Sequence, residues 1–277
     1  MTVEAPLFGS TELGERIERA EAQLISAATE AAGLRTGGET FVIPVAGGVA
    51  CFAEAGSPMN KVVGLGFHGR PKDDELDDLE RAFAARGTAV QVELSNLADP
   101  EIASVLTGRG YQLVSFENVL GRQVLDGPQS ERPSNVEVRL SDDLEAWIDV
   151  VVEGFAHPDS EGVPSHEEFP REIVANAERD MERAGAAPYL AFCDGVVAGG
   201  AGMCMTEGVA QLTGAATAPA YRRRGVQTAL LSARLADAAR AGCEIAVVTT
   251  QPGSKSQQNV QRRGFHLLYT RAVLVKD

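Results

Sequence analysis

The sequence predicts an α/β protein made of two similar halves. Two observations predict this class. Short apolar runs alternate with amphipathic helical patterns, the order typical of strand–helix–strand units. In addition, residues 90–120 are repeated, with one gap, by residues 245–274. At 277 residues the chain is long enough for two domains, each with its own core.

The repeat pairs two similar tails. Residues 90–95 correspond to residues 245–250, and Arg109-Gly110-Tyr111 corresponds to Arg263-Gly264-Phe265. Each copy therefore ends in a strand, a short helix, a glycine and a last strand. Self-similarity over so long a period predicts two copies of one domain, because solenoid repeats are much shorter.

A polar, turn-forming segment separates the copies. Residues 127–135 contain a glycine, two prolines and two serines, a composition typical of a linker. We therefore expect one domain over residues 1–126 and another over residues 136–277.

Composition excludes several functional classes. The net charge of −14 and the pI near 4.8 argue against a nucleic-acid surface, although an acidic protein could favour a cationic amine substrate. No apolar run reaches the length of about 18 residues that a membrane span needs, and the first residues lack the basic start of a signal peptide. We expect a cytoplasmic protein that binds no membrane.

Cysteines and histidines are scattered without the spacing of metal ligands, so we expect reduced, buried cysteines and no metal site. These residues are Cys51, Cys193, Cys204 and Cys243, with His68, His157, His166 and His266.

The second half begins with a strand near residues 136–140 and a helix with one apolar face from Leu144 to Phe155. A loop over residues 157–169 and a helix over residues 171–184 follow. Two hairpin turns are then predicted at Asp194-Gly195 and Glu207-Gly208. Glycines inside the flanking strands indicate a bulge or a close backbone approach; they are Gly199, Gly200, Gly202 and Gly214.

The next segment predicts an anion site. An apolar strand ends near Pro219, the basic turn Arg222-Arg223-Arg224-Gly225 comes next, and a helical pattern then runs to about Ala241. A helix N-terminus carries unpaired N–H groups and the positive end of the helix dipole, and glycine lets a ligand approach the backbone.

The remainder of the chain, together with this turn, resembles the GCN5-related N-acetyltransferase (GNAT) family: a buried strand over residues 244–250, a short helix that ends at Gly264-Phe265, and a last strand over residues 267–275. The resemblance covers roughly residues 136–277, and the family includes tandem members. It implies two tandem domains of this fold, each a central mixed β-sheet flanked by helices. It implies acetyl-CoA as cosubstrate, with pyrophosphate on the turn and pantetheine along the preceding strand end. The implied contact residues are Ala216, Thr217, Arg222, Arg223, Arg224, Gly225, Val226, Gln227, Thr228 and Asn259. Gln227 departs from the family pattern, where glycine or alanine is usual.

The resemblance also implies direct attack of an amine on the acetyl thioester, with a small-molecule or peptide amine as acceptor and a homodimer left open. In many members of the family a tyrosine protonates the departing thiolate, and this chain has Val260 at the position of that tyrosine. Tyr269 could substitute, although a packing role is more typical of a strand residue. Glu207 is expected to be a solvated turn residue, so no base is assigned and the catalytic residues stay unknown. Two alternatives remain: a non-catalytic acyl-CoA-binding or regulatory module, and a binder of other anions or nucleotides.

The first copy lacks the features of a phosphate site. Residues 64–69 spell G-x-G-x-x-G, but the dinucleotide fingerprint needs a helix that opens at the third glycine. Here Arg70-Pro71-Lys72 intervenes, and the helix start over residues 73–78 is acidic, which disfavours a pyrophosphate. We expect the first copy to have lost coenzyme binding and to serve as scaffold or as a wall of the acceptor pocket.

Overall fold

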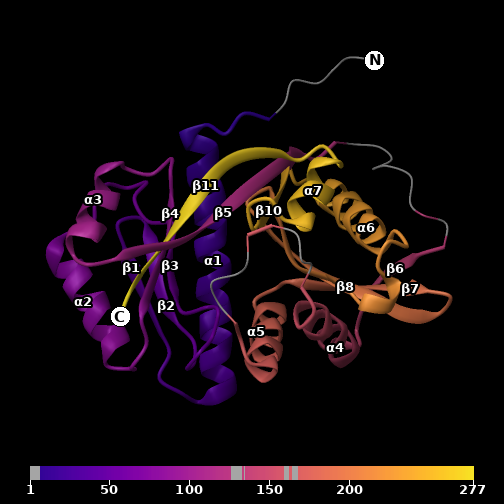
Figure 1. Cartoon of the computed structure of the whole chain (residues 1–277), viewed down its shortest axis with the longest axis horizontal. Helices are drawn as coiled ribbons and strands as arrows, with labels where there is room; N and C mark the ends of the chain where they lie inside the picture. Colours follow the sequence, from indigo (N-terminus) through magenta and orange to yellow (C-terminus); the bar gives the residue numbers. More distant parts are fainter. Residues whose placement is uncertain (1–6, 126–132, 134, 159–161, 164–167) are drawn as a thin grey trace. The chain divides into compact units, whose positions relative to one another are not determined.

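The computed structural model describes residues 7–125, 133, 135–158, 162–163 and 168–277 (Figure 1). Backbone contacts divide the chain into two units. The first unit comprises Met1–Arg122, Glu161–Phe169 and Thr249–Asp277, and the second comprises Gln123–Ser160 and Pro170–Val248.

The first unit is a mixed sheet with helices on both faces. Its strands lie in the order β1 (Phe41–Val45), β2 (Gly48–Phe52), β3 (Lys61–Val63), β4 (Val90–Ser95), β11 (His266–Lys276), β5 (Gln112–Gln123). Strands β3 and β4 are parallel and are joined through α2 (Asp73–Ala84), whereas β11 is antiparallel to both β4 and β5. The other helices are α1 (Thr11–Thr36), α3 (Glu101–Gly108) and α7 (Lys255–Gln261).

Strand alternation separates an apolar face of this sheet from a charged one. On β4, Val92 and Leu94 join the apolar core with α2 and α3. Glu93, between them, is 2% exposed on the opposite face, where α1 supplies Glu18. We call the buried and partly buried polar side chains there the charge cluster; they are Glu18, Lys61, Glu93, Glu117, Tyr269 and Arg271.

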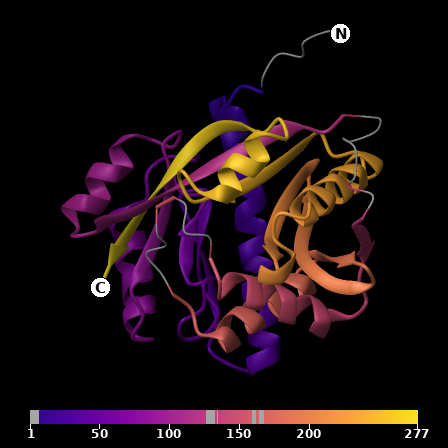
Figure 2. The same ribbon diagram turned by 45° about the vertical axis from the view of Figure 1, so that its right-hand side comes forward.

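The second unit has the strand order β10 (Ile245–Thr250), β9 (Val209–Thr217), β8 (Val196–Thr206), β7 (Ala187–Cys193), β6 (Glu137–Leu140). Strands β9 and β10 are parallel, and the other neighbours are antiparallel. Figures 1 and 2 show α6 (Val226–Arg240) on one face of this sheet and α4 (Leu144–Phe155) with α5 (Arg171–Arg183) on the other. The predicted α/β class is confirmed.

The internal repeat is also present in the structure. The order β3-α2-β4-α3-β5 in the first copy matches β9-α6-β10-α7-β11 in the second, and each copy has one parallel pair at the same place. The expected boundary differs from the contact division, because Thr249–Asp277 packs with the first unit. This segment contains β11, which pairs with β4 of the first unit from Arg271 opposite Ser95 to Lys276 opposite Val90.

Two predicted segments fall largely outside the described residues. Of the linker over residues 127–135, only Pro133 and Asn135 are described. Of the loop over residues 157–169, residues 159–161 and 164–167 are not.

Glycines let α4 lie close to β8. A Cβ at Gly200 would lie 2.9 Å from Val151 Cγ2 and 3.0 Å from Trp147 Cδ1. Trp147 is fully buried, and its indole Nε1 donates a hydrogen bond of 3.1 Å to the carbonyl oxygen of Ala201. The close backbone approach that the glycines predicted is therefore confirmed.

We expect Trp147→Phe to lower the free energy of unfolding by about 2–4 kcal/mol, since it leaves a cavity and a buried carbonyl without its donor. Urea denaturation measures the loss. Phe155→Leu, at an exposed position of the same helix, is the control and should change stability by less than about 0.5 kcal/mol. A comparable loss in both variants would contradict the role assigned to the indole.

Candidate functional site

Strand β9 carries a bulge. Opposite β8, Thr217 pairs with Gly199 and Ala216 with Gly200, but the next pair is Thr213 with Gly202. Two residues of β9, Gly214 and Ala215, therefore oppose the single residue Ala201 of β8, which defines a β-bulge. Gly214 has φ +51°, in the region that favours glycine. The bulge predicted from the strand glycines is confirmed.

Two buried side chains hold the bulge from opposite faces of the sheet. Trp147 on α4 donates its indole N–H to the carbonyl oxygen of Ala201. Arg234 on α6 donates to the carbonyl oxygens of Gly202 at 2.9 Å and Thr213 at 3.4 Å. Arg234 is 4% exposed, and burial lowers its pKa to about 10. It therefore stays protonated at neutral pH and places a positive charge beneath the bulge.

The basic turn comes directly after β9. After the short 3-10 helix Pro219–Tyr221, Arg223 has φ +62° and Gly225 has φ +86°. Gly225 is the N-cap of α6, and no side chain caps this helix. A non-glycine residue in the left-handed region costs roughly 1–2 kcal/mol, and such strain clusters at functional sites.

The three arginines of the turn have different surroundings. The Arg222 guanidinium donates to the carbonyl oxygen of His157. Arg224 pairs with Asp194 at 3.1 Å and lies over the Tyr221 ring. Arg223 is exposed and pairs with no carboxylate of the described residues. The turn is thus fixed by two arginines, and the third faces solvent.

The end of β9 packs closely against α4, and the neighbouring strand β8 packs against the start of α6. A Cβ at Gly154 on α4 would lie 2.4 Å from Ala216 Cβ, and a Cβ at Gly199 would lie 2.6 Å from Val226 Cγ1. Beside this contact the hydroxyl of Thr217 is buried and has no hydrogen-bond partner among the described residues. Buried polar atoms are nearly always satisfied, so an orphaned hydroxyl at this place favours a ligand contact.

Sequence reasoning missed one residue of this site, Glu178 on α5. Its carboxylate oxygens lie 3.1 and 3.2 Å from the position of a Cβ at Gly214, so the carboxylate rests on the bulge. Glu178 is half-buried, and removal of water around the carboxylate raises its pKa to about 7. No sequence signal distinguishes it, because α5 is rich in carboxylates.

All the sequence-predicted contact residues except Asn259 belong to the second unit. They lie at the end of β9, in the turn and in the first turn of α6, whereas Asn259 lies on α7 of the first unit. Gln227 and Thr228, the second and third residues of α6, are half-buried.

Three positions were considered for acid or base roles: Tyr269, Val260 and Glu207. Tyr269 is 3% exposed and donates to Glu18 Oε1 at 2.7 Å, which supports the packing interpretation. Val260 is buried, so the place of the family tyrosine is apolar. Glu207 is exposed in the turn before β9, at the end of that strand opposite to Thr217.

In the first unit the corresponding helix start is that of α2, where carboxylates of the same segment accept hydrogen bonds from the backbone N–H groups. The Lys72 N–H donates to Glu75 Oε2 at 2.8 Å, and the Glu75 N–H donates to Asp74 Oδ1 at 3.0 Å. Carboxylates thus occupy the positive end of α2, whereas α6 begins at a glycine.

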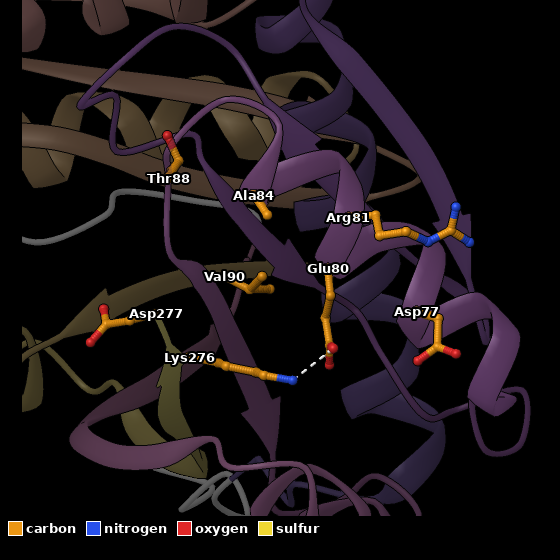
Figure 3. A pocket seen from close by; sticks show the side chains of 8 residues that line it. All are labelled: Asp77, Glu80, Arg81, Ala84, Thr88, Val90, Lys276 and Asp277. Carbon is orange, nitrogen blue, oxygen red and sulfur yellow. Dashed lines mark hydrogen bonds and ion pairs between the residues drawn. The ribbon is translucent and has the colours of Figure 1, made fainter.

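A cavity of about 470 Å³ lies in the first unit and contains no predicted site residue (Figure 3). Across it Lys276 Nζ and Glu80 Oε2 point toward one another at 2.7 Å. The lining residues are Asp77, Glu80, Arg81, Ala84, Thr88, Val90, Lys276 and Asp277.

The bulged strand, the basic turn and the uncapped helix together form the candidate functional site of the second unit. Residues 151–265 match the model of the Acetyltransferase (GNAT) family. This match to part of the chain confirms the resemblance that the sequence indicated. No curated protein matches the chain.

Solved structures similar to the chain share its whole fold. A GCN5-related N-acetyltransferase from Kribbella flavida is 19% identical with a TM-score of 0.66, covering 92% of this chain and 95% of that one. A GCN5-related N-acetyltransferase from Sphaerobacter thermophilus is 19% identical, with a TM-score of 0.57 and coverages of 95% and 93%. A tandem GNAT protein from the clavulanic acid biosynthesis pathway is 15% identical, with a TM-score of 0.60 and coverages of 98% and 97%. These likenesses show the tandem fold.

Within the described residues, no helix has the length and apolar character needed to cross a membrane. The four cysteines, all described, are buried and form no disulfide.

Proposed function

We propose that the second unit transfers an acetyl group from acetyl-CoA to an amine. The observation that carries this proposal is the basic turn: two left-handed residues, Arg223 and Gly225, present an uncapped helix start directly after a bulged strand. Backbone N–H groups at a helix N-terminus bind phosphate well, and the arginines add positive charge. The turn would hold the pyrophosphate of the coenzyme.

The bulge is suited to the reacting end of the coenzyme. At a bulge the backbone ladder is interrupted, so polar groups of β9 can bond to pantetheine and to the thioester carbonyl. Donors placed there stabilise the oxyanion that forms when the amine attacks. Thr217 lies on the path between the turn and the bulge, and its orphaned hydroxyl supports this route.

The first unit, in this proposal, binds no coenzyme. Its α2 start is closed by Glu75 and Asp74, and Arg70 just before it is paired with Glu101. A pyrophosphate there would have to displace carboxylates from the helix end. The buried, reduced cysteines support a cytoplasmic setting for the reaction.

The test is a transfer assay. The protein is mixed with acetyl-CoA and a panel of amines that includes polyamines, aminoglycosides, lysine and peptides with free N-termini. Free thiol is followed with a chromogenic reagent, and acetylated product by mass spectrometry. Enzyme-dependent product supports the proposal. Tight acetyl-CoA binding without product from any amine favours the non-catalytic acyl-CoA-binding module.

A further inference from the structure

Glu178 is held in place over the bulge of β9 by the packing of its helix. Two ion pairs join α5 to α4: Arg171 with Glu153 at 3.0 Å and Arg179 with Glu145 at 2.7 Å. Helix α4 in turn lies against β8 and β9 through glycine contacts. The Glu178 carboxylate is thereby fixed against the Gly214 backbone.

Gly214 is the residue that makes this position available. A Cβ there would meet both Glu178 oxygens within 3.2 Å, and φ +51° would strain any side chain. Glycine therefore allows the carboxylate to approach the backbone where the ladder is open, at the place where the thioester would lie.

The charged groups around Glu178 are committed to other partners. On α4, Glu145 and Glu153 bind Arg179 and Arg171, the arginines of α5 on either side of Glu178. Strand β9 brings no charged side chain to the carboxylate. Glu178 itself makes no hydrogen bond or ion pair with the described residues. Burial alone raises its pKa to about 7, with no nearby charge contributing.

We propose that Glu178 is the general base that takes a proton from the acceptor amine. This assignment rests on the proposed function. The amine nitrogen forms a C–N bond to the thioester carbonyl carbon, whose oxygen becomes the oxyanion, and the N–H proton passes to a Glu178 oxygen. Collapse of the tetrahedral intermediate breaks the C–S bond. The CoA thiolate leaves with the electron pair and is protonated by solvent, which also receives the proton from Glu178.

A base of this kind suits catalysis near neutral pH. A carboxyl with an ordinary pKa is a weak base, whereas one that titrates near the working pH is a stronger base of which a substantial fraction is still ionised. We expect kcat/KM to rise with pH through about 7, where Glu178 ionises.

The test is Glu178→Gln, with Glu172→Gln as a matched control at an exposed position of the same helix. We expect Glu178→Gln to lower kcat about 100- to 1,000-fold and to remove the inflection near pH 7 from the pH profile. The dissociation constant for acetyl-CoA should stay within about twofold of wild type. Glu172→Gln should keep wild-type kcat and profile. A Glu178→Gln enzyme with wild-type kcat and pH profile overturns the assignment.

A second measurement does not depend on turnover. Because the folded protein raises the pKa of Glu178, the carboxyl contributes stability below its unfolded pKa of about 4.3 and loses it as pH rises through 7. Relative to wild type, Glu178→Gln should therefore gain thermal stability between pH 5 and pH 8. A stability difference that does not change with pH overturns the burial that the base requires.

The two proposals can fail separately. A wild-type protein that acetylates no amine overturns the transferase function, and the base with it, even if Glu178 titrates near pH 7. An active wild type with an equally active Glu178→Gln variant overturns the base alone.

Discussion

Replacing Arg271 with methionine is expected to lower the free energy of unfolding by about 3–5 kcal/mol, the typical result of removing one partner from a buried ion pair. Arg271 is 1% exposed and binds Glu18 at 2.7 Å and Glu93 at 3.4 Å, with Glu117 at 3.8 Å. Lys61, 2.8 Å from Glu93, is the other cation of the charge cluster. Without Arg271 the cluster keeps the buried carboxylates of Glu18 and Glu93, the partly buried carboxylate of Glu117, and one cation.

The loss of unfolding free energy in Arg271→Met should be larger at pH 8 than at pH 5. Burial already raises the pKa of Glu18, and burial with the neighbouring Glu93 charge raises that of Glu117 to about 7. Removing the cation raises these values further, so the variant binds protons more tightly when folded. Its stability is then highest below the unfolded carboxyl pKa of about 4.3 and falls as pH rises.

Urea denaturation at the two pH values measures both effects. Arg139→Met is the control, since Arg139 forms an exposed pair with Glu137 and its removal should change stability little. A loss below about 1 kcal/mol for Arg271→Met, the range of surface pairs, would contradict the role of the charge cluster.

Gly225→Asp is expected to weaken acetyl-CoA binding more than about 100-fold, or roughly 2.7 kcal/mol. Gly225 has φ +86°, and a Cβ there would lie 2.8 Å from Pro133 Cγ, so a side chain changes the shape of the turn. The aspartate also puts a negative charge where the pyrophosphate would bind. Calorimetry measures the affinity, and circular dichroism checks that the fold is kept.

Two controls separate shape, charge and strain. Gly225→Ala keeps the backbone strain and the contact with Pro133 but adds no charge. It should therefore weaken acetyl-CoA binding less than Gly225→Asp does. Gly242→Asp, at the opposite end of α6, has a similar positive φ of +76° with open space around its Cβ. It should lose stability without losing affinity. Unchanged affinity in Gly225→Asp would contradict the coenzyme assignment.

Local sequence predicted the parts of the site that depend on neighbours in the chain. The repeat, the bulge at Gly214 and the turn at Gly225 were all indicated by glycine positions, strand patterns and a helix start. The bulge and the turn are each specified within about ten residues, where propensity and turn chemistry act directly, and the repeat is found by comparing two such stretches of sequence.

Pairing between residues far apart in the chain could not be predicted from local sequence. Strands β4 and β10 have similar apolar patterns, so nothing local shows that β11 joins the sheet beside β4. Arg271 stands in an apolar strand and is buried only because Glu18, far away in the chain, neutralises it. Glu178 is one of several carboxylates on α5, and only its place over Gly214 distinguishes it.

Titration of the purified protein with acetyl-CoA by calorimetry tests the central claim most directly, because it gives both affinity and stoichiometry. We expect one site per chain, still one in Asp73→Asn and Asp74→Asn, and none at the same concentrations in Gly225→Asp. Two sites per chain would contradict the closed α2 start of the first unit. No binding by the wild-type protein would contradict the coenzyme site in the second.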